Sequence, residues 1–145
     1  MIHLTELYSV PLALMMMGLS AHVSILRGKT AISILDGGNI TLAERIRRHA
    51  NFAENVSIAL LLMAFAEASG KAPLWTHAAG LALLAGRFLH PLGLFHDRPV
   101  TAARIAGGSL TMLSMLISMV NIVLDKWGAR FFTPDVETGS ARSSP

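Results

Sequence analysis

A run of 20 residues, from Ile105 to Leu124, contains no charged side chain, and it constrains the fold more than any other feature of the sequence. A helix of about 20 apolar residues spans the hydrocarbon core of a bilayer, where every backbone group must be hydrogen-bonded internally. The composition agrees, because 52% of the 145 residues are hydrophobic and 14% are charged, against about 25% charged in soluble domains. The sequence therefore predicts a membrane protein.

Apolar segments elsewhere in the chain predict three further helices. The first segment is not typical of a cleaved signal peptide, because Glu6 is acidic and the apolar run continues to Leu26. We expect an all-α fold, a membrane-spanning four-helix bundle within residues 1–132, followed by a disordered tail at 133–145 that is rich in Ser, Thr, Gly and Pro. The expected helices cover about 4–27, 41–69, 73–95 and 99–127.

Local signals define the expected ends of these helices. Thr41 and Glu44 have the spacing of a capping box, in which each side chain accepts a hydrogen bond from a free amide of the first turn. Gly70 is suited to end the second helix, and Pro73 fits the first turn of the third because its missing N–H is not needed there. Pro99 is expected to open the fourth helix in the same way.

Positive charges are distributed unevenly between the two expected sides of the membrane. Loops one and three, with their helix ends, are rich in cations, whereas the short second loop holds only Lys71. Cytoplasmic loops are enriched in Lys and Arg, so we expect loops one and three in the cytoplasm and both termini on the non-cytoplasmic side. The cations of loops one and three are Arg27, Lys29, Arg45, Arg47, Arg48, Arg87, Arg98 and Arg104.

Small and polar residues recur every three or four positions along the fourth helix. Such a seam permits close helix packing and cross-helix hydrogen bonds in lipid. A packing seam is the favoured interpretation, and a polar conduction path is the alternative. The seam consists of Arg104, Gly107, Thr111, Ser114, Ser118 and Asn121.

The second helix begins with a column of polar residues. Arg47, Asn51 and Glu54 fall within about 60° of one another on a helix, with Glu44 on the same flank. Arginines near span ends commonly anchor a protein to anionic lipid, which is the expectation for Arg48 and its neighbour Arg45 taken alone. A carboxylate close to hydrocarbon needs a partner, so Glu54 indicates either a structural ion pair with another helix or a functional site.

The segment from Arg47 to Glu54, R-x-H-x-N-x-x-E, resembles the helix-two signature of the membrane-associated proteins in eicosanoid and glutathione metabolism, the MAPEG family. The resemblance extends over about residues 4–127. The other positions that agree are Arg27 at the end of helix one, Gly86-Arg87-Phe88-Leu89-His90 in helix three and Arg104 in helix four.

The resemblance implies a homotrimer that binds glutathione as co-substrate at subunit interfaces near the cytoplasmic membrane surface. A hydrophobic small-molecule electrophile would enter from the lipid, as in detoxification, and the location would be the bacterial inner membrane. The resemblance implies a catalytic role in thiolate formation for Arg104. It implies glutathione-binding roles for Arg27, Arg47, His49, Asn51, Glu54, Arg87 and His90.

Three functions are compatible with these residues. The first is a glutathione transferase or peroxidase, and the second is a non-catalytic protein of the same fold that binds lipid or a protein partner. Asn55 and His90 stand where family members commonly have tyrosine, and the one tyrosine, Tyr8, is predicted at the opposite membrane face. Donors to glutathione would therefore be His90, Asn55 or Arg87. The third, a small drug and proton exporter, needs a carboxylate near mid-membrane, whereas Glu6 and Glu54 lie near helix ends.

Two classes of partner are not expected. The absence of Cys excludes thiolate metal ligands and a cysteine nucleophile, and we expect no metal. A formal charge of +3, without a basic patch interleaved with aromatic residues, gives no indication of nucleic acid.

Overall fold

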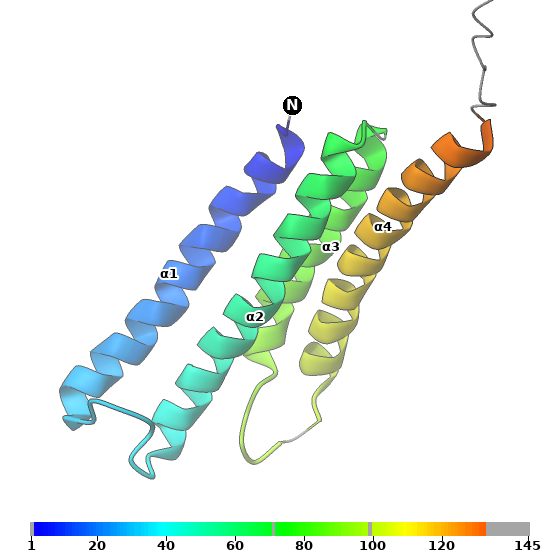
Figure 1. Cartoon of the computed structure of the whole chain (residues 1–145). Coiled ribbons are helices and arrows are strands. Elements are labelled where there is room, and N and C mark those ends of the chain that lie inside the picture. The colour runs from blue at the N-terminus through cyan, green and yellow to red at the C-terminus, as the bar shows by residue number, and fades with distance from the viewer. Residues whose placement is uncertain (1, 71, 99, 133–145) are drawn as a thin grey trace, which may run out of the picture.

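Four antiparallel helices lie side by side in the computed structural model (Figure 1), which describes residues 2–70, 72–98 and 100–132, with side chains as far as Asp125. The expected all-α four-helix bundle is confirmed. The α1–α2 and α3–α4 loops lie at one end, called the charged end below, and the N-terminus and the α2–α3 turn lie at the other, the far end. The helices are α1 (Leu4–Thr30), α2 (Ile40–Ala68), α3 (Pro73–Leu92) and α4 (Ala102–Phe132).

Three of the helices in the described part of the chain are long and apolar enough to cross a membrane, namely α1, α2 and α4 as far as Asp125. The shorter α3 carries Arg87 and His90, which lower its hydropathy. Both side chains face into the bundle, where they are 2% and 8% exposed. A buried position of this kind keeps ionisable groups away from lipid while the helix still packs with its neighbours. The tail expected at 133–145 lies outside the described residues.

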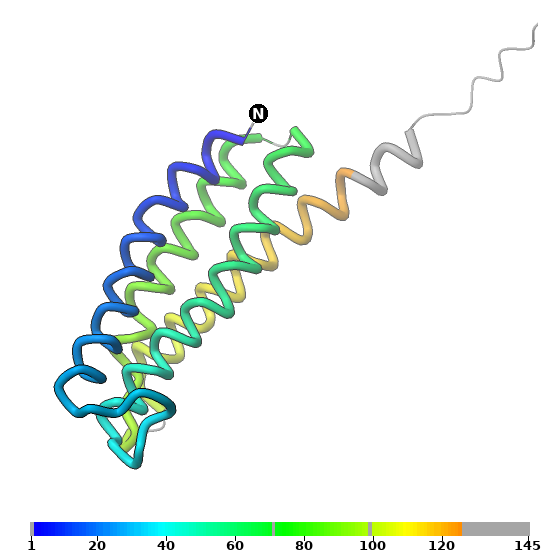
Figure 2. The backbone as a smooth tube through the Cα atoms, turned by 60° about the vertical axis from the view of Figure 1, so that its left-hand side comes forward, coloured from blue at the N-terminus to red at the C-terminus, as the bar shows by residue number. Residues whose placement is uncertain are grey.

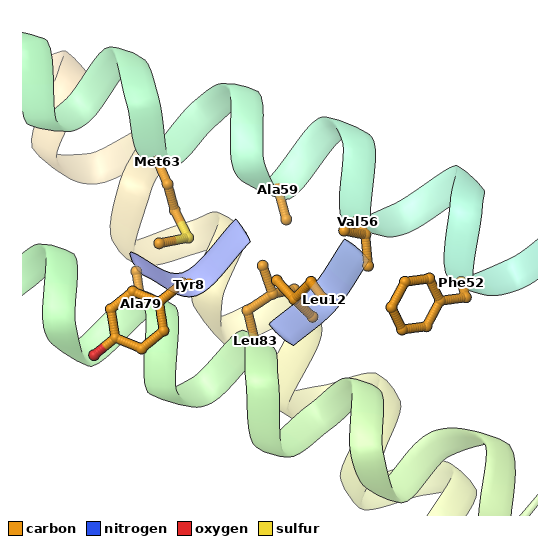
Figure 3. Close-up of a cluster of buried hydrophobic side chains, with 8 residues drawn as sticks. All are labelled: Tyr8, Leu12, Phe52, Val56, Ala59, Met63, Ala79 and Leu83. Atoms are coloured by element: carbon orange, nitrogen blue, oxygen red, sulfur yellow. The ribbon is translucent and has the colours of Figure 1, made fainter. Parts of the chain in front are cut away.

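The apolar core joins α1, α2 and α3 in the middle of the bundle (Figure 3). Its side chains occur every three or four positions on each helix, so each helix presents one stripe to the others. Figure 2 shows α4 diverging from the other helices towards its C-terminal end. The core residues are Tyr8 and Leu12 on α1, Phe52, Val56, Ala59 and Met63 on α2, and Ala79 and Leu83 on α3.

The α4 seam packs against α3 and is a packing seam as expected. Thr111 and Ser114 are 0% exposed. A Cβ atom placed on Gly107 would lie 2.6 Å from the backbone nitrogen of His90, so the two backbones approach closely. Two seam hydroxyls bond within α4 itself: Thr111 Oγ1 donates to Gly107 O at 2.9 Å and Ser118 Oγ donates to Ser114 O at 3.1 Å. This local bonding satisfies the hydroxyl and leaves the helices free to approach.

The N-terminal caps of α2 and α4 differ from the expected ones. The prediction of a capping box formed by Thr41 and Glu44 is wrong. The N-cap is Asn39, whose Oδ1 accepts from the backbone N–H of Leu42 at 3.0 Å. The fourth helix begins at Ala102 rather than near Pro99, since Thr101 Oγ1 accepts from the N–H of Arg104 at 3.2 Å. Asn and Thr side chains satisfy first-turn amides well, so the helix begins where such a side chain is available.

Helix α1 is capped at its N-terminus by a side chain from another helix. Glu67, near the end of α2, accepts from the backbone N–H groups of His3, Leu4 and Thr5 at 2.8, 2.7 and 2.8 Å. Its Oε2 also accepts from Thr5 Oγ1 at 2.7 Å. A carboxylate is favourable here because the free amides and the helix dipole make the N-terminus positive. Glu67 therefore fixes the far end of α1 to α2.

Replacing Glu67 tests this cap. Glu67→Ala is expected to lower the free energy of unfolding by about 2 kcal/mol, because it removes all four charge-assisted hydrogen bonds. Glu67→Gln retains one acceptor oxygen and should lose less. Thermal unfolding in detergent measures the change, with Glu6→Ala as the control that removes an exposed carboxylate from the first turn of α1. An equal loss in the two alanine variants would contradict the cap.

Candidate functional site

The predicted polar column of α2 forms one exposed face at the charged end. Arg47 NH1 lies 3.8 Å from Glu54 Oε1, and the two side chains are 62% and 59% exposed. The face continues with Ile58 and Leu61, which are 53% and 50% exposed. An exposed ion pair at this distance contributes little to the stability of one chain in water. Arg47 and Glu54 are therefore presented outwards, where a ligand or a second copy can reach them.

The third member of the column, Asn51, turns instead towards α3. Arg87 NH1 donates to Asn51 Oδ1 at 3.1 Å and lies 3.4 Å from the Asn51 backbone oxygen. Arg87 is 2% exposed, and its Nε has no hydrogen-bond partner. Because a guanidinium has only donors, it fixes the amide with its oxygen towards α3. Arg87 therefore positions the Asn51 side chain.

The backbone oxygen of Asn51 accepts a second hydrogen bond, from a side chain of α2 itself. Asn55 Nδ2 donates to the Asn51 backbone oxygen at 2.8 Å. The Asn51 carbonyl thus accepts from Asn55 and faces Arg87, so the backbone at this turn is held from two sides. Asn55 therefore serves the helix backbone in this structure.

His90 and Arg104 share a groove at the charged end. A groove of about 780 Å³ is lined by both residues and by Val100 at that end. It continues along an apolar face of α4. Ligand pockets commonly have such a size, an apolar lining and a few converging polar groups. The α4 residues that line it are Ile105, Gly108, Ser109, Met112, Leu113 and Leu116.

The charges at this end converge on His90. Arg87, Arg104 and Arg47 all lie within electrostatic reach of its ring. These arginines come from three different helices, so the fold concentrates positive charge around one half-enclosed position. A cleft of one charge sign attracts ligands of the opposite sign. The arrangement suits an anionic ligand.

Two predicted site residues, Arg27 and His49, lie outside the contacts described above. Arg27 NH1 donates to the backbone oxygens of Ile32 and Leu35 at 3.2 and 2.9 Å, so it stabilises the α1–α2 loop. Both of these acceptors lie in the loop rather than on α2. His49 lies half-buried on α2. The structure thus brings together Arg47 with Glu54, Asn51 with Arg87, and His90 with Arg104.

Sequence reasoning missed one set of polar contacts at this end. Arg48 was expected to anchor to lipid, but its Nε and NH2 donate to the Leu94 backbone oxygen at 3.1 and 2.6 Å. Glu44 Oε1 accepts from the backbone N–H of His96 at 2.9 Å. The available signal was the i, i+4 spacing of Glu44 and Arg48, which is typical of a helix-surface pair. Its loop partner lies about 50 residues away and has no local signal.

Arg45 also differs from the lipid-anchoring expectation. Its NH1 donates to the backbone oxygen of His22 at 2.9 Å. Arg45 therefore joins α2 to the C-terminal part of α1, near the point where α1 ends at Thr30.

Comparison with known proteins identifies relatives of this chain. The family model described as "MAPEG family" matches residues 5–124. The chain is 37% identical over 116 residues to "Inner membrane protein YecN" of Escherichia coli strain K12, a match that covers 80% of this chain and 87% of that protein. The protein of the same name from an Escherichia coli O6:H1 strain matches equally. No solved structure matches significantly.

Substitutions of Asn51 test its contact with Arg87. Asn51→Ala is expected to lower the free energy of unfolding by about 2 kcal/mol, because it removes the side-chain acceptor of a buried guanidinium and leaves only the longer contact to the backbone oxygen of residue 51. Asn51→Asp is expected to unfold at or above the wild-type temperature, since its carboxylate pairs with the same guanidinium. Thermal unfolding in detergent measures both variants. Equal destabilisation by Ala and Asp would contradict the contact.

Proposed function

The chain belongs to the MAPEG family, and on that premise we propose that it is a membrane-bound glutathione transferase or peroxidase. In this proposal it binds glutathione and activates the thiol towards lipophilic electrophiles. The observation that carries the proposal is the groove that His90 and Arg104 share with the apolar face of α4. One end of this groove offers the Arg104 guanidinium to a thiolate, and the rest offers apolar contacts to a hydrophobic molecule.

Glutathione has the chemical groups that this end of the bundle complements. It carries two carboxylates, one ammonium group, two amides and a thiol. Arg47 can form paired hydrogen bonds with a carboxylate, and the nearby Glu54 can accept from the ammonium group. The exposure of both side chains, 62% and 59%, leaves them accessible to the ligand. Asn51, His49 and His90 would meet the amide and carboxylate groups, with Asn51 held in place by Arg87.

Arg104 is the proposed catalytic residue. A thiolate is the nucleophilic form of glutathione, and a neighbouring guanidinium stabilises it relative to the thiol. The thiol proton passes to water at the charged end, and the sulfur lone pair then forms a bond to the electrophilic carbon of the second substrate. The bond from that carbon to its leaving group breaks, and the leaving group departs with the bonding electron pair. That substrate would occupy the apolar part of the groove, which is reached from the lipid.

A homotrimer accounts for the outward position of Arg47 and Glu54. Charged groups on the outer face of a membrane helix are unfavourable against lipid, and a neighbouring subunit would cover them. In this assembly the partner would contribute residues such as Arg27 to the same glutathione molecule. The distribution of cations favours a site that faces the cytoplasm. The name of the relatives, inner membrane protein, supports a location in the bacterial inner membrane.

One observation favours a second candidate, a non-catalytic family member that binds lipid or a protein partner. Tyr8 is the one tyrosine in the sequence. Its hydroxyl lies 2.8 Å from His77 Nδ1, in the half of the bundle near the far end. A phenol is therefore not available to the groove from this chain. The proposed transferase must stabilise the thiolate with arginine alone.

A thiolate difference spectrum in the ultraviolet tests the proposed function. Adding glutathione to the detergent-purified protein near neutral pH is expected to produce a thiolate signal. Arg104→Ala should abolish the signal and leave glutathione binding detectable, because the guanidinium stabilises the charge on sulfur. Arg47→Ala and Glu54→Ala should each weaken binding about tenfold, as expected for a lost charge-assisted contact.

Arg98→Ala is the matched control, because Arg98 is 74% exposed in the α3–α4 loop and pairs with Asp97 beside it. This variant should retain both binding and the thiolate signal. A trimer that binds glutathione without forming a thiolate would support the non-catalytic candidate. Equal glutathione binding by the wild type, Arg47→Ala and Glu54→Ala would contradict the assigned binding residues.

A further inference from the structure

Two residues in the charged block at the start of α2 are not used by the proposed glutathione site. Glu44 and Arg48 are one helical turn apart, and both contact the α3–α4 loop. Glu44 Oε1 accepts from the backbone N–H of His96 at 2.9 Å and lies 2.8 Å from its Nδ1. Arg48 holds the Leu94 backbone oxygen with two nitrogens, at 3.1 and 2.6 Å. These side chains and the segment Leu94 to His96 are called the loop latch below.

The loop latch is a connected network rather than a set of separate contacts. Arg48 NH2 lies 3.3 Å from Glu44 Oε2, and the two side chains are only 22% and 16% exposed. The Arg48 guanidinium also lies 5.2 Å from the centre of the Phe95 ring, a cation–π contact. Shielded hydrogen bonds to charged groups are stronger than exposed ion pairs. The latch therefore holds the loop against α2.

The latched segment is connected to the start of α4 through Gly93. Thr101 Oγ1 donates to the Gly93 backbone oxygen at 2.6 Å and accepts from the backbone N–H of Arg104 at 3.2 Å. A Cβ atom on Gly93 would collide with the backbone nitrogen of Arg104, so the two backbones are in direct contact. A continuous path of close contacts thus leads from Glu44 on α2 to Arg104 on α4.

We propose that Glu44 and Arg48 are positioning residues for Arg104. They fix the loop against α2, which carries Arg47 and Glu54, and the loop fixes the first turn of α4. The distance between the glutathione-binding column and the catalytic guanidinium is thereby set by the latch. This inference rests on the proposed function, because Arg104 needs to be positioned only if it acts on a bound ligand. Glu44 itself does not touch the ligand.

The first experiment compares thiolate formation with glutathione binding in latch variants. Glu44→Ala is expected to reduce the thiolate signal at saturating glutathione about tenfold, because a small displacement of a catalytic group reduces its effect steeply. Binding should change less than about twofold, since Arg47, Asn51 and Glu54 remain. Glu44→Gln retains an acceptor for the His96 N–H and should recover part of the signal. Arg98→Ala, in the same loop, should match the wild type.

A parallel loss of binding and thiolate in Glu44→Ala would overturn the proposal, because it would show a general structural role. An unchanged thiolate signal in Glu44→Ala would overturn it as well. Partial recovery by Glu44→Gln supports it, since the conservative variant differs from alanine in the hydrogen bond rather than in charge.

The second experiment measures how firmly residue 104 is held in the absence of glutathione, from the mobility of a spin label. The sequence contains no Cys, so Arg104→Cys provides a single site for a nitroxide spin label. Adding Glu44→Ala is expected to increase the mobility of this label in the full-length protein in detergent, whereas adding Arg98→Ala is not. Unchanged mobility would overturn the latch. If the wild type forms no thiolate, the proposed function fails. An increase in label mobility on adding Glu44→Ala would still support the latch in that case.

Discussion

The close approach of α3 and α4 is the constraint on which the charged end depends. A Cβ atom on Gly107 would lie 2.6 Å from the backbone nitrogen of His90, and one on Gly86 would lie 2.8 Å from the Gly107 oxygen. Only glycine permits this contact, because any side chain would separate the helices. The approach places His90 in the same groove as Arg104 and turns Arg87 inwards, where it is 2% exposed. The close approach of α3 and α4 thus accounts for both the groove and the buried position of Arg87.

Several ionisable groups in the described part of this bundle have internal partners, whereas others lie exposed on its surface. Arg87 donates to Asn51, and Glu67 accepts four hydrogen bonds at the start of α1. Arg47 and Glu54 instead remain exposed near the end of a helix that is apolar enough to cross a membrane. A bilayer penalises such exposure, so these two charges are the ones for which the fold itself provides no complete structural explanation.

Local sequence signals predicted the helices but not the contacts between distant segments. Four apolar runs predicted the four-helix bundle, and the small and polar residues along α4 predicted a packing surface. The expected cap at Glu44 failed because Asn39 provides a better one and because His96, about 50 residues later, takes the Glu44 carboxylate. Helix periodicity predicted the polar column on α2. It did not predict that the Asn51 side chain would turn towards α3, because that direction depends on the hydrogen bond from Arg87. Such pairings follow from packing between helices, which periodicity does not determine.

The first turns of α2 carry many charged side chains because these side chains point to two different faces of the helix. Successive residues of a helix differ by about 100° in direction, so the adjacent Arg47 and Arg48 point to different surroundings. Arg47 is 62% exposed, whereas Arg48 is 22% exposed and bonded to the α3–α4 loop. If both arginines only anchored the protein to lipid headgroups, both would extend into solvent. Their division leaves one face of α2 exposed, where the proposed ligand would bind, while the adjacent face holds the α3–α4 loop that leads to Arg104.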